Sequence, residues 1–413
     1  MNTGAGPATP GADTPGRPAG RGQARLQRAL GEALSSLALP ALAILTGLAI
    51  GSFIIVVTDL EVLQAWRQGL RAPGAALSAT WRSVARAYGA LLEGSLGSGY
   101  AISESLVTTT PYIFAGLAVA VGFRAGLFNI GAEGQLYVGA LAAVWVGYSV
   151  RNLPAIVHLP LALAAAAAAG GLWAAVPGYL KARTGAHEVV NTIMMNYIAF
   201  RLSDWLLNGP MKRPGPGGTP GFVPVSPEVL PTAYLPQLFE PPIRFHVGFF
   251  LALAAAGLAF WLVFHTPWGF EMRTVGANPH AARTAGIPVA RVYVVTMAIS
   301  GCLAALAGAS QVLGVDHWVG QGFSPGYGFD SIALALLGRS HPGGVVLAAL
   351  LFGTLRSGAT RMQSAAGIPI DIVTILQAVI LAFVAAPALV RALFRLRRVE
   401  GVQTVFTRGW GRQ

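Results

Sequence analysis

Charged side chains are scarce in this sequence of 413 residues: they make up 11% of it, against 54% hydrophobic residues and a mean hydropathy of +0.59. A soluble domain usually carries about 25% charged residues. Apolar runs near the roughly 20 residues needed to cross a bilayer recur along the chain. The composition therefore predicts an all-α fold, a polytopic membrane protein of about ten transmembrane helices with broken or re-entrant segments.

Cysteine and lysine are nearly absent. The single cysteine, Cys302, excludes an intrachain disulfide and fits a small core residue in a glycine-rich helix. The two lysines, Lys181 and Lys212, lie in the contexts LKA and MKR. A phosphate-binding loop needs Gly-Lys-Ser/Thr, so the chain cannot bind ATP in that way. A transport cycle driven by ATP would need a separate ATPase subunit on the cytoplasmic face.

Catalytic and metal-binding patterns are also missing. The sequence has no HExxH pattern and no Ser/Lys pair on neighbouring turns, so we expect neither an enzyme nor a metal or cofactor site in this chain. Acidic residues within the predicted spans are few, and no run of acids and histidines resembles a proton relay. The main intramembrane acids are Glu133, Glu188 and Asp330.

The net charge of +12 comes from arginines that flank the apolar spans. This pattern is typical of the cytoplasmic ends of membrane helices, and it lacks the interleaved aromatic residues of a nucleic-acid-binding face. We therefore expect contact with membrane lipid and none with nucleic acid. The two terminal clusters consist of Arg17, Arg21, Arg25, Arg28, Arg391, Arg395, Arg397 and Arg398.

The order of segments predicts one membrane domain between two tails. Residues 1–36 are polar and rich in glycine and proline, which predicts a disordered cytoplasmic tail. Residues 37–390 form the predicted transmembrane domain, and residues 391–413 a basic cytoplasmic tail. We place the spans at about residues 37–58, 102–122, 126–149, 155–180, 188–207, 247–264, 292–314, 332–338, 343–360 and 370–390.

Three segments between the spans are too polar or too irregular to cross. Residues 59–100 alternate aromatic residues with arginine and predict an interfacial amphipathic helix. Residues 209–245, full of proline and glycine, predict an outer loop, and residues 265–290 a cytoplasmic loop. An even number of crossings places both termini inside, although a re-entrant segment at 332–338 would change this parity. The same side receives Arg124, Lys181, Arg183, Arg283 and Arg339.

The stretch GLFNIGAEGQLYVG, residues 126–139, places polar groups and four glycines between apolar flanks. A charge at mid-bilayer costs about 2.5–3.5 kcal/mol on insertion scales, so these groups must face protein or water rather than lipid. Asn129 and Gln135 are candidate contacts for the hydroxyls or base edges of a substrate. For Glu133 we favour a structural anchor, because a neutral solute does not need a buried carboxylate.

Other polar and aromatic residues are candidates for the same path. Asn191 and Asn196 lie five positions apart on one predicted helix, so they occupy different faces, and interhelical packing is the commoner role for such residues. Phe329, with Phe323 and Tyr327, could stack on a flat base or belong to an interfacial aromatic belt. Asp330 is expected to cap the helix that begins beside it.

The 265–290 segment resembles a docking element. Asn278 and Pro279 predict the start of a short helix, and Gly286 with Pro288 predict its end. Its small-residue face, Ala281, Ala282 and Ala285, would fit a groove on a partner; a plain cytoplasmic loop is the alternative. A weak internal sequence similarity, between LAVAVGFR at 117–124 and IALALLGR at 332–339, is compatible with an internal repeat, as found in many transporters.

Four motifs occur in order: GLFNIGAEGQ, EVVNTIMMNYIA, RTVGANPHAARTAGI and GFDSIALALLGRSHPGG. Together, over roughly residues 111–360, they resemble the permease subunits of ATP-binding-cassette importers of the branched-chain amino acid, ribose and simple-sugar class, most of all the nucleoside permeases. Residues 280–286, HAARTAG, resemble the coupling loop of importer permeases, with histidine in place of its first glutamate. Candidates for contact with the ATPase are therefore Gly276, Asn278, His280, Ala281, Ala282, Gly286 and Ile287.

The resemblance implies a type II-like importer architecture in the bacterial cytoplasmic (inner) membrane. It implies cassette ATPase subunits that carry ATP and Mg²⁺, a second and related permease, and an extracytoplasmic substrate-binding protein. The expected solute is a nucleoside or a simple sugar, moved by alternating access. The alternatives are an importer of branched-chain amino acids and a secondary transporter that works alone.

Overall fold

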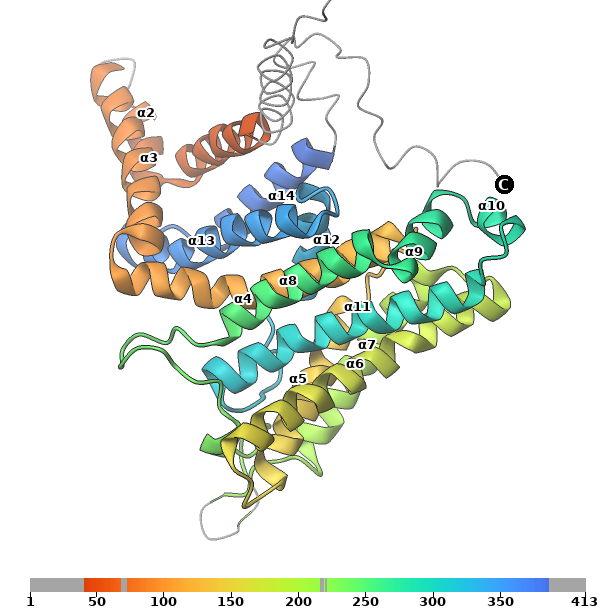
Figure 1. Ribbon diagram of the computed structural model, residues 1–413. Coiled ribbons are helices and arrows are strands. Elements are labelled where there is room, and N and C mark those ends of the chain that lie inside the picture. The colour runs from red at the N-terminus through yellow and green to blue at the C-terminus, as the bar shows by residue number, and fades with distance from the viewer. Residues whose placement is uncertain (1–40, 68–72, 216–218, 220, 386–413) are drawn as a thin grey trace, which may run out of the picture.

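The computed structural model describes residues 41–67, 73–215, 219 and 221–385 (Figure 1). Both predicted tails and both terminal arginine clusters lie outside these residues. The described chain is almost entirely helical, which confirms the all-α prediction, and it contains two isolated β-bridges but no β-sheet. Its helices are Ala41–Thr58, α2 (Leu60–Arg67), α3 (Pro73–Leu96), α4 (Gly99–Arg124), α5 (Ala132–Ser149), α6 (Ala155–Thr184), α7 (Glu188–Asn208), α8 (Gly248–His265), α9 (Pro267–Ala277), α10 (Pro279–Thr284), α11 (Val289–Gln311), α12 (Tyr327–Leu337), α13 (Pro342–Ala366) and α14 (Asp371–Ala385).

Each of the ten predicted spans contains a helix, but the helices are of two kinds. Six of those in the described ranges are long and apolar enough to cross a bilayer: Ala41–Thr58, α4, α6, α8, α13, and α11 together with the π-helical turn η3 (Val312–Asp316). α5 and α7, with 18 and 21 residues, carry polar side chains, and α12 and α14, with 11 and 15, are short. α5, α7 and α12 carry buried polar side chains, whereas the long apolar α4 is the most buried of the six.

α12 is a half-length helix. Its 11 residues rise about 16 Å, roughly half of the 30 Å hydrocarbon core. Residues 317–326, which precede it, are irregular, so chain and helix together make one crossing. The arrangement matches the predicted broken segment at 332–338, and the even number of crossings stays a prediction. α5 is likewise preceded by non-helical chain, residues 125–131, which we call the junction segment.

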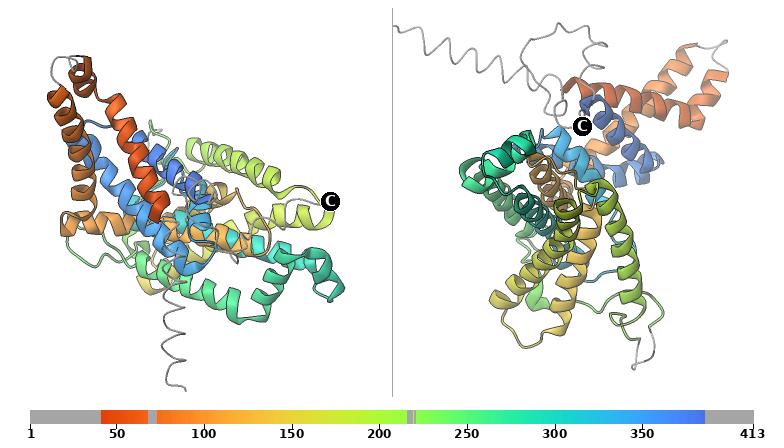
Figure 2. Two further views of the ribbon diagram at one scale, coloured as in Figure 1. Left: turned by 90° about the horizontal axis from the view of Figure 1, so that it is seen from above. Right: turned by 90° about the vertical axis from the view of Figure 1, so that its right-hand side faces the viewer.

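α4 forms the centre of the bundle, packed by α8, α11, α12 and α13 (Figure 2). Every residue from Thr109 to Gly122 is buried. A helix covered on all sides must be apolar all round, and the sequence from Tyr112 to Val121 is apolar or glycine at each position. This helix therefore anchors the elements that carry the polar site.

The first described helix packs with α3, α13 and α14 in a separate apolar cluster that includes Ile55, Leu91, Leu355 and Leu376. α3 approaches α13 closely because Gly358 has no side chain: a Cβ there would lie 2.3 Å from the carbonyl oxygen of Leu91. The 59–100 segment thus contains two helices, α2 and α3. Their position at the membrane interface stays a prediction.

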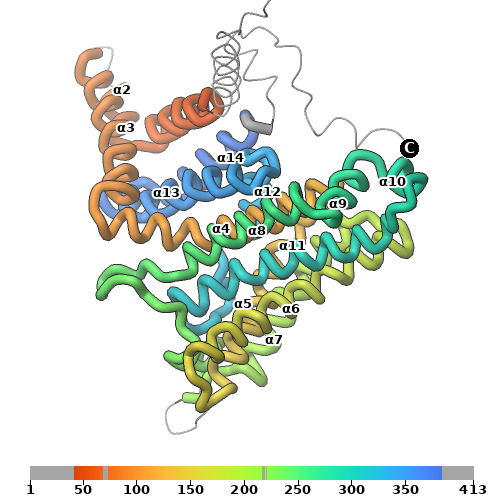
Figure 3. Tube along the Cα trace, viewed as in Figure 1, coloured from red at the N-terminus to blue at the C-terminus, as the bar shows by residue number. Residues whose placement is uncertain are grey.

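The predicted outer loop is irregular, as expected, and it is held against the end of α11 (Figure 3). The backbone N–H of Leu235 donates to Leu313 (2.9 Å), and that of Ser226 donates to Val319 (2.8 Å). This segment lies at the lower left in Figure 1, whereas α9 and α10 lie at the right with the carboxyl ends of α4 and α6. The described arginines and the lysine predicted to be cytoplasmic belong to that second end.

The two segments with similar sequence, 117–124 and 332–339, meet at the end of the bundle that carries α9 and α10. Arg124 finishes α4, and its Nε donates to the carbonyl of Ser340 (2.9 Å) in the turn after α12. Its Nη2 donates to the carbonyl of Arg339 (3.3 Å). The matching arginines of LAVAVGFR and IALALLGR are therefore neighbours in space, and the turn that follows α12 is fixed to the carboxyl end of α4.

Candidate functional site

The junction segment is organised by Asn129, which is fully buried. Its Nδ2 donates to Gln135 Oε1 (2.9 Å) and to Ser300 Oγ (2.8 Å), and its Oδ1 accepts from Gly131 N–H (2.9 Å) and from Gln135 Nε2 (3.0 Å). Ser300 of α11 donates in turn to the carbonyl of Ala118 (2.6 Å) in α4. A single amide therefore connects the junction segment to α5 and α11, and through Ser300 to α4.

This network uses both donors of Asn129 and two acceptor positions on its oxygen. Buried polar groups need such partners, since each unsatisfied one costs about 1–3 kcal/mol. Asn129 and Gln135 hold the chain in this conformation, and contact with a substrate would require the network to open. Their role as substrate contacts stays a prediction.

Glu133 joins the amino ends of two helices. It is 2% exposed, and its Oε2 accepts from the backbone N–H of Gly328 (2.6 Å), in the first turn of α12. The two helix starts are in backbone contact, because a Cβ on Gly328 would lie 2.2 Å from Glu133 N. An anion is favourable where two helix amino ends converge. This contact agrees with the structural role favoured from the sequence, which stays a prediction.

Asp330 does not make the capping contact that we expected of it. α12 begins after Gly326, and the carboxylate that accepts from its first turn is Glu133 of another helix. Asp330 is the fourth residue of α12, and its Oδ2 accepts a hydrogen bond from the hydroxyl of Tyr112 (2.8 Å) in α4. Asp330 lies in the first turn of α12, so its position relative to the helix dipole is as expected, but the capping hydrogen bond is supplied by Glu133.

The two asparagines of α7 have different surroundings, as their spacing predicts. Asn196 is 2% exposed; its Oδ1 accepts from Gly134 N–H (2.8 Å) and its Nδ2 donates to the carbonyl of Ile130 (2.9 Å). This is the expected interhelical packing, and it fixes the start of α5. Asn191 is partly exposed, and its Nδ2 is buried without a partner among the described residues.

The three aromatic candidates separate in the structure. Tyr327 is buried against Tyr112, with ring centroids 4.9 Å apart. Phe323 packs on Tyr137 of α5 at 4.8 Å. Phe329 is 47% exposed and points away from the core. Only Phe329 and Phe323 therefore offer surface to a ligand or to lipid, and their role stays a prediction.

The 265–290 segment is more ordered than the loop we expected, because it contains both α9 and α10. Asn278 caps α10 as predicted: its Oδ1 accepts from the N–H groups of His280 (2.9 Å) and Ala281 (3.1 Å), and Pro279 is the first helical residue. Gly286 follows the helix end with φ +82°, a conformation that favours glycine. His280 and Ala281 are exposed.

One residue of the predicted docking face points inward. Ala282 is fully buried in an apolar cluster with Leu127, Met272 and Val292. The prediction that it belongs to an exposed small-residue face is wrong, because α10 must bury one side to stay attached. Ala281 and Ala285 remain exposed, and Ile287 is partly buried.

α9 is in direct contact with the junction segment. A Cβ on Gly276 would lie 2.3 Å from the carbonyl oxygen of Arg124 and 2.9 Å from Gly126 N. Gly126 has φ +70°, which again favours glycine. The residue that α9 contacts, Gly126, therefore lies only three positions before Asn129 in the sequence. A displacement of α9 would therefore act directly on the backbone of the segment that carries Asn129 and its hydrogen-bond network.

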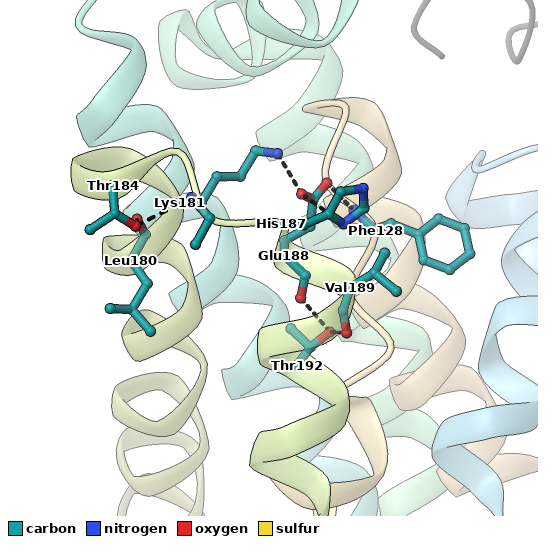
Figure 4. Close-up of polar contacts among 9 residues, drawn as sticks. Phe128, Leu180, Lys181, Thr184, His187, Glu188, Val189 and Thr192 are labelled. Carbon is teal, nitrogen blue, oxygen red and sulfur yellow. Dashed lines mark hydrogen bonds and ion pairs between the residues drawn. The ribbon is translucent and has the colours of Figure 1, made fainter. Parts of the chain in front are cut away.

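A partly buried ion pair between α6 and α7 also contacts the junction segment (Figure 4). Lys181 Nζ, at the end of α6, lies 2.5 Å from Glu188 Oε2, at the start of α7. Glu188 is 6% exposed, and its Oε1 accepts a long hydrogen bond from Phe128 N–H (3.5 Å). Sequence reasoning missed this pair; the spacing of opposite charges, seven residues apart around Gly185, was the available signal.

The junction segment and the irregular chain before α12 interrupt two helices of the bundle, and the two helix starts that follow them are in contact. Two helix starts meet about halfway through the bundle, and the chain that leads to one of them is held by surface helices at one end. Similar broken helices at mid-membrane depth form the binding regions of many transporters. Six described helices are long and apolar enough to cross a membrane, as in a polytopic membrane protein, and the described residues contain no metal-binding cluster of histidine, cysteine or acids.

The chain belongs to the family of permease components of the branched-chain amino acid transport system, whose model matches residues 101–385. It is 42% identical to the guanosine ABC transporter permease protein NupP of Bacillus subtilis, over 89% of this chain and 98% of the relative. It is 36% identical to the glucose ABC transporter permease protein TsgB13 of Haloferax volcanii, over 83% and 86%. A second Bacillus subtilis permease, NupQ, matches at 27% over 62% and 80%.

No solved structure matches the chain. The family and its relatives are transport components rather than enzymes, so this chain is a multi-pass permease subunit of an ABC transporter. The resemblance inferred from the four motifs is confirmed.

Proposed function

We propose that this permease carries a neutral polar solute, a nucleoside in preference to a simple sugar, into a bacterial cell across the cytoplasmic membrane. The proposal on the solute rests on the relatives: NupP is named for guanosine and TsgB13 for glucose. The few acidic side chains near the path are engaged in contacts within the protein, as with Glu133 and Glu188. A neutral solute fits such a path better than an ion.

The contact between Gly276 and Gly126 is the observation that supports coupling to an ATPase. A cassette ATPase that binds ATP and Mg²⁺ docks on the exposed residues of α9 and α10. Its closure moves α9, which displaces the junction segment and thereby the start of α5 against α12. The exposed candidates for this contact are Asn278, His280, Ala281 and Gly286.

Three further features belong to the proposal. Both termini lie in the cytoplasm, on the side of α9 and α10, where the positive-inside rule places Arg124, Lys181, Arg183, Arg283 and Arg339. The second permease is a related chain, as NupP and NupQ occur in one bacterium. An extracytoplasmic protein delivers the solute to the opposite end, beside the outer loop predicted at residues 209–245.

Reconstitution tests the proposal. The permease, a related second permease and the cassette ATPase are placed in liposomes with the binding protein, and uptake of tritiated guanosine and of labelled glucose is followed with and without ATP. We expect ATP-dependent uptake, with guanosine preferred. ATP hydrolysis by the isolated chain, or uptake without ATP or the ATPase, would contradict the account and favour a transporter that works alone.

A further inference from the structure

A small pocket with polar and aromatic lining lies at the end of the molecule opposite α9 and α10. The helix formed by α11 and η3 runs 28 residues, about 42 Å, between the two ends. The pocket has a volume of about 160 Å³ and forms where the chain turns back after η3. It is lined by Asp316, Trp318, Gly320, Gln321 and Phe323. The same chain continues directly into α12, whose first turn is bound to Glu133.

Asp316 gives the pocket an acceptor that the protein does not use fully. Its Oδ2 accepts from Gln311 Nε2 (3.1 Å), whereas Oδ1 has no donor within the part of the chain that the structure describes. The carboxylate is half-buried. A partly dry carboxylate with a free oxygen binds N–H or O–H donors strongly, because charge-assisted hydrogen bonds are shorter and stronger than neutral ones.

The neighbouring acids are already paired, which singles out Asp316. Asp204 of α7 lies 3.4 Å from Arg201 and accepts from Gln321 Nε2 (2.9 Å). Glu104 accepts two hydrogen bonds from Arg244. Among the described residues around the pocket, Asp316 is the acid without an ion-pair partner.

Two aromatic rings give the pocket flat apolar surface. Trp318 is 39% exposed, and its ring lies on Gly320: a Cβ at that glycine would be 2.7 Å from the indole carbon Cζ3. Phe323 is held by Tyr137 of α5. A planar ligand gains about 1–3 kcal/mol per base from stacking on such rings.

We propose that this pocket binds the base of a nucleoside, with the ring against Trp318 and its N–H groups donating to Asp316. The proposal rests on the proposed function and assigns the first binding site on the uptake path. Pockets for whole drug-sized ligands measure about 300–1,000 Å³, so this one holds a single ring system and leaves the ribose outside. Guanine suits it well, since it presents two adjacent N–H donors to one carboxylate.

Direct binding to the complete complex tests the site. The complex of permeases and ATPase is placed in nanodiscs without the binding protein, and the affinity for tritiated guanosine is measured for Asp316→Asn, Gly320→Ala and the control Gly257→Ala. Gly257 has open space around it. We expect Asp316→Asn to weaken guanosine binding about tenfold or more, as loss of a charge-assisted hydrogen bond does. Gly320→Ala should weaken it severalfold by displacing the ring of Trp318, and the control should leave it unchanged.

Glucose separates the ligand classes, because it has neither the planar ring nor the N–H edge. Unchanged guanosine affinity in Asp316→Asn would overturn the proposal, as would equal losses for guanosine and glucose. In a parallel ATPase assay with the binding protein added, a variant that keeps its guanosine affinity and loses only its stimulation by that protein would identify a docking surface instead and would also overturn the proposal. Uptake of guanosine by the wild-type complex keeps the proposed function intact in each of these cases, whereas ATP-dependent uptake of neither solute would defeat the proposed function itself.

Discussion

The contact between Glu133 and Gly328 makes a quantitative prediction. Glu133→Ala removes the acceptor for a buried N–H and the anion at the start of α12. An unsatisfied buried N–H costs about 1–3 kcal/mol, and loss of the favourable helix-dipole interaction adds about 0.3–1 kcal/mol, more when partly buried. The expected loss of unfolding free energy is therefore about 1–4 kcal/mol.

Glu133→Gln separates the hydrogen bond from the charge. The amide keeps an oxygen that accepts from Gly328, but a neutral hydrogen bond contributes about 1 kcal/mol less than a charge-assisted one. Reversible unfolding of the purified permease in mixed micelles should rank wild type above Gln and Gln above Ala. Glu61→Ala, an exposed carboxylate on α2, is the control and should change little.

The ranking distinguishes an anchor from a substrate contact. If Glu133 holds α12, the free energy of unfolding falls slightly in Glu133→Gln and further in Glu133→Ala. Solute uptake then decreases in the same order. Unchanged stability in Glu133→Ala would refute the anchoring role. Unchanged stability together with a weaker apparent affinity for solute would assign the carboxylate to the solute.

Two further contacts give predictions of the same kind. Gly328→Ala places a Cβ against the backbone of Glu133 and should cost about 1–3 kcal/mol of unfolding free energy, in contrast to Gly257→Ala. Lys181→Met leaves Glu188 buried without its cation and should cost about 3–5 kcal/mol, measured by the same unfolding titration. Combining it with Glu188→Gln should recover most of that loss, and a double variant as unstable as Lys181→Met would argue against the ion pair.

Much of the fold follows from the sequence because membrane spans and caps are local signals. Apolar runs of bilayer length place the long helices, and the Asn278–Pro279 pair places the start of α10, since the cap is made within three residues. The weaker predictions concern partners distant in sequence. No local pattern says that Glu133, 195 positions from Gly328, caps α12 in place of Asp330.

The candidate site shows the same division. The sequence predicts that the polar groups of the 126–139 stretch must face protein or water. In the structure Asn129 and Gln135 face protein, because they are buried and hydrogen-bonded to each other. It cannot show that they satisfy each other, because the geometry depends on Ser300, which lies 171 positions away. The inward turn of Ala282 was missed for a similar reason: its apolar partners come from α9, α11 and the junction segment.

The central claim is that α9 transmits the work of an ATPase to the junction segment through Gly276. Gly276→Ala should force the two backbones apart, and the decisive measurement is the amount of guanosine taken up per ATP hydrolysed by the reconstituted complex, with Gly257→Ala as control. We predict ATP hydrolysis within about twofold of wild type and a transport ratio lowered about fivefold or more, as for loss of an allosteric coupling. A folded Gly276→Ala complex with the wild-type ratio would contradict the account.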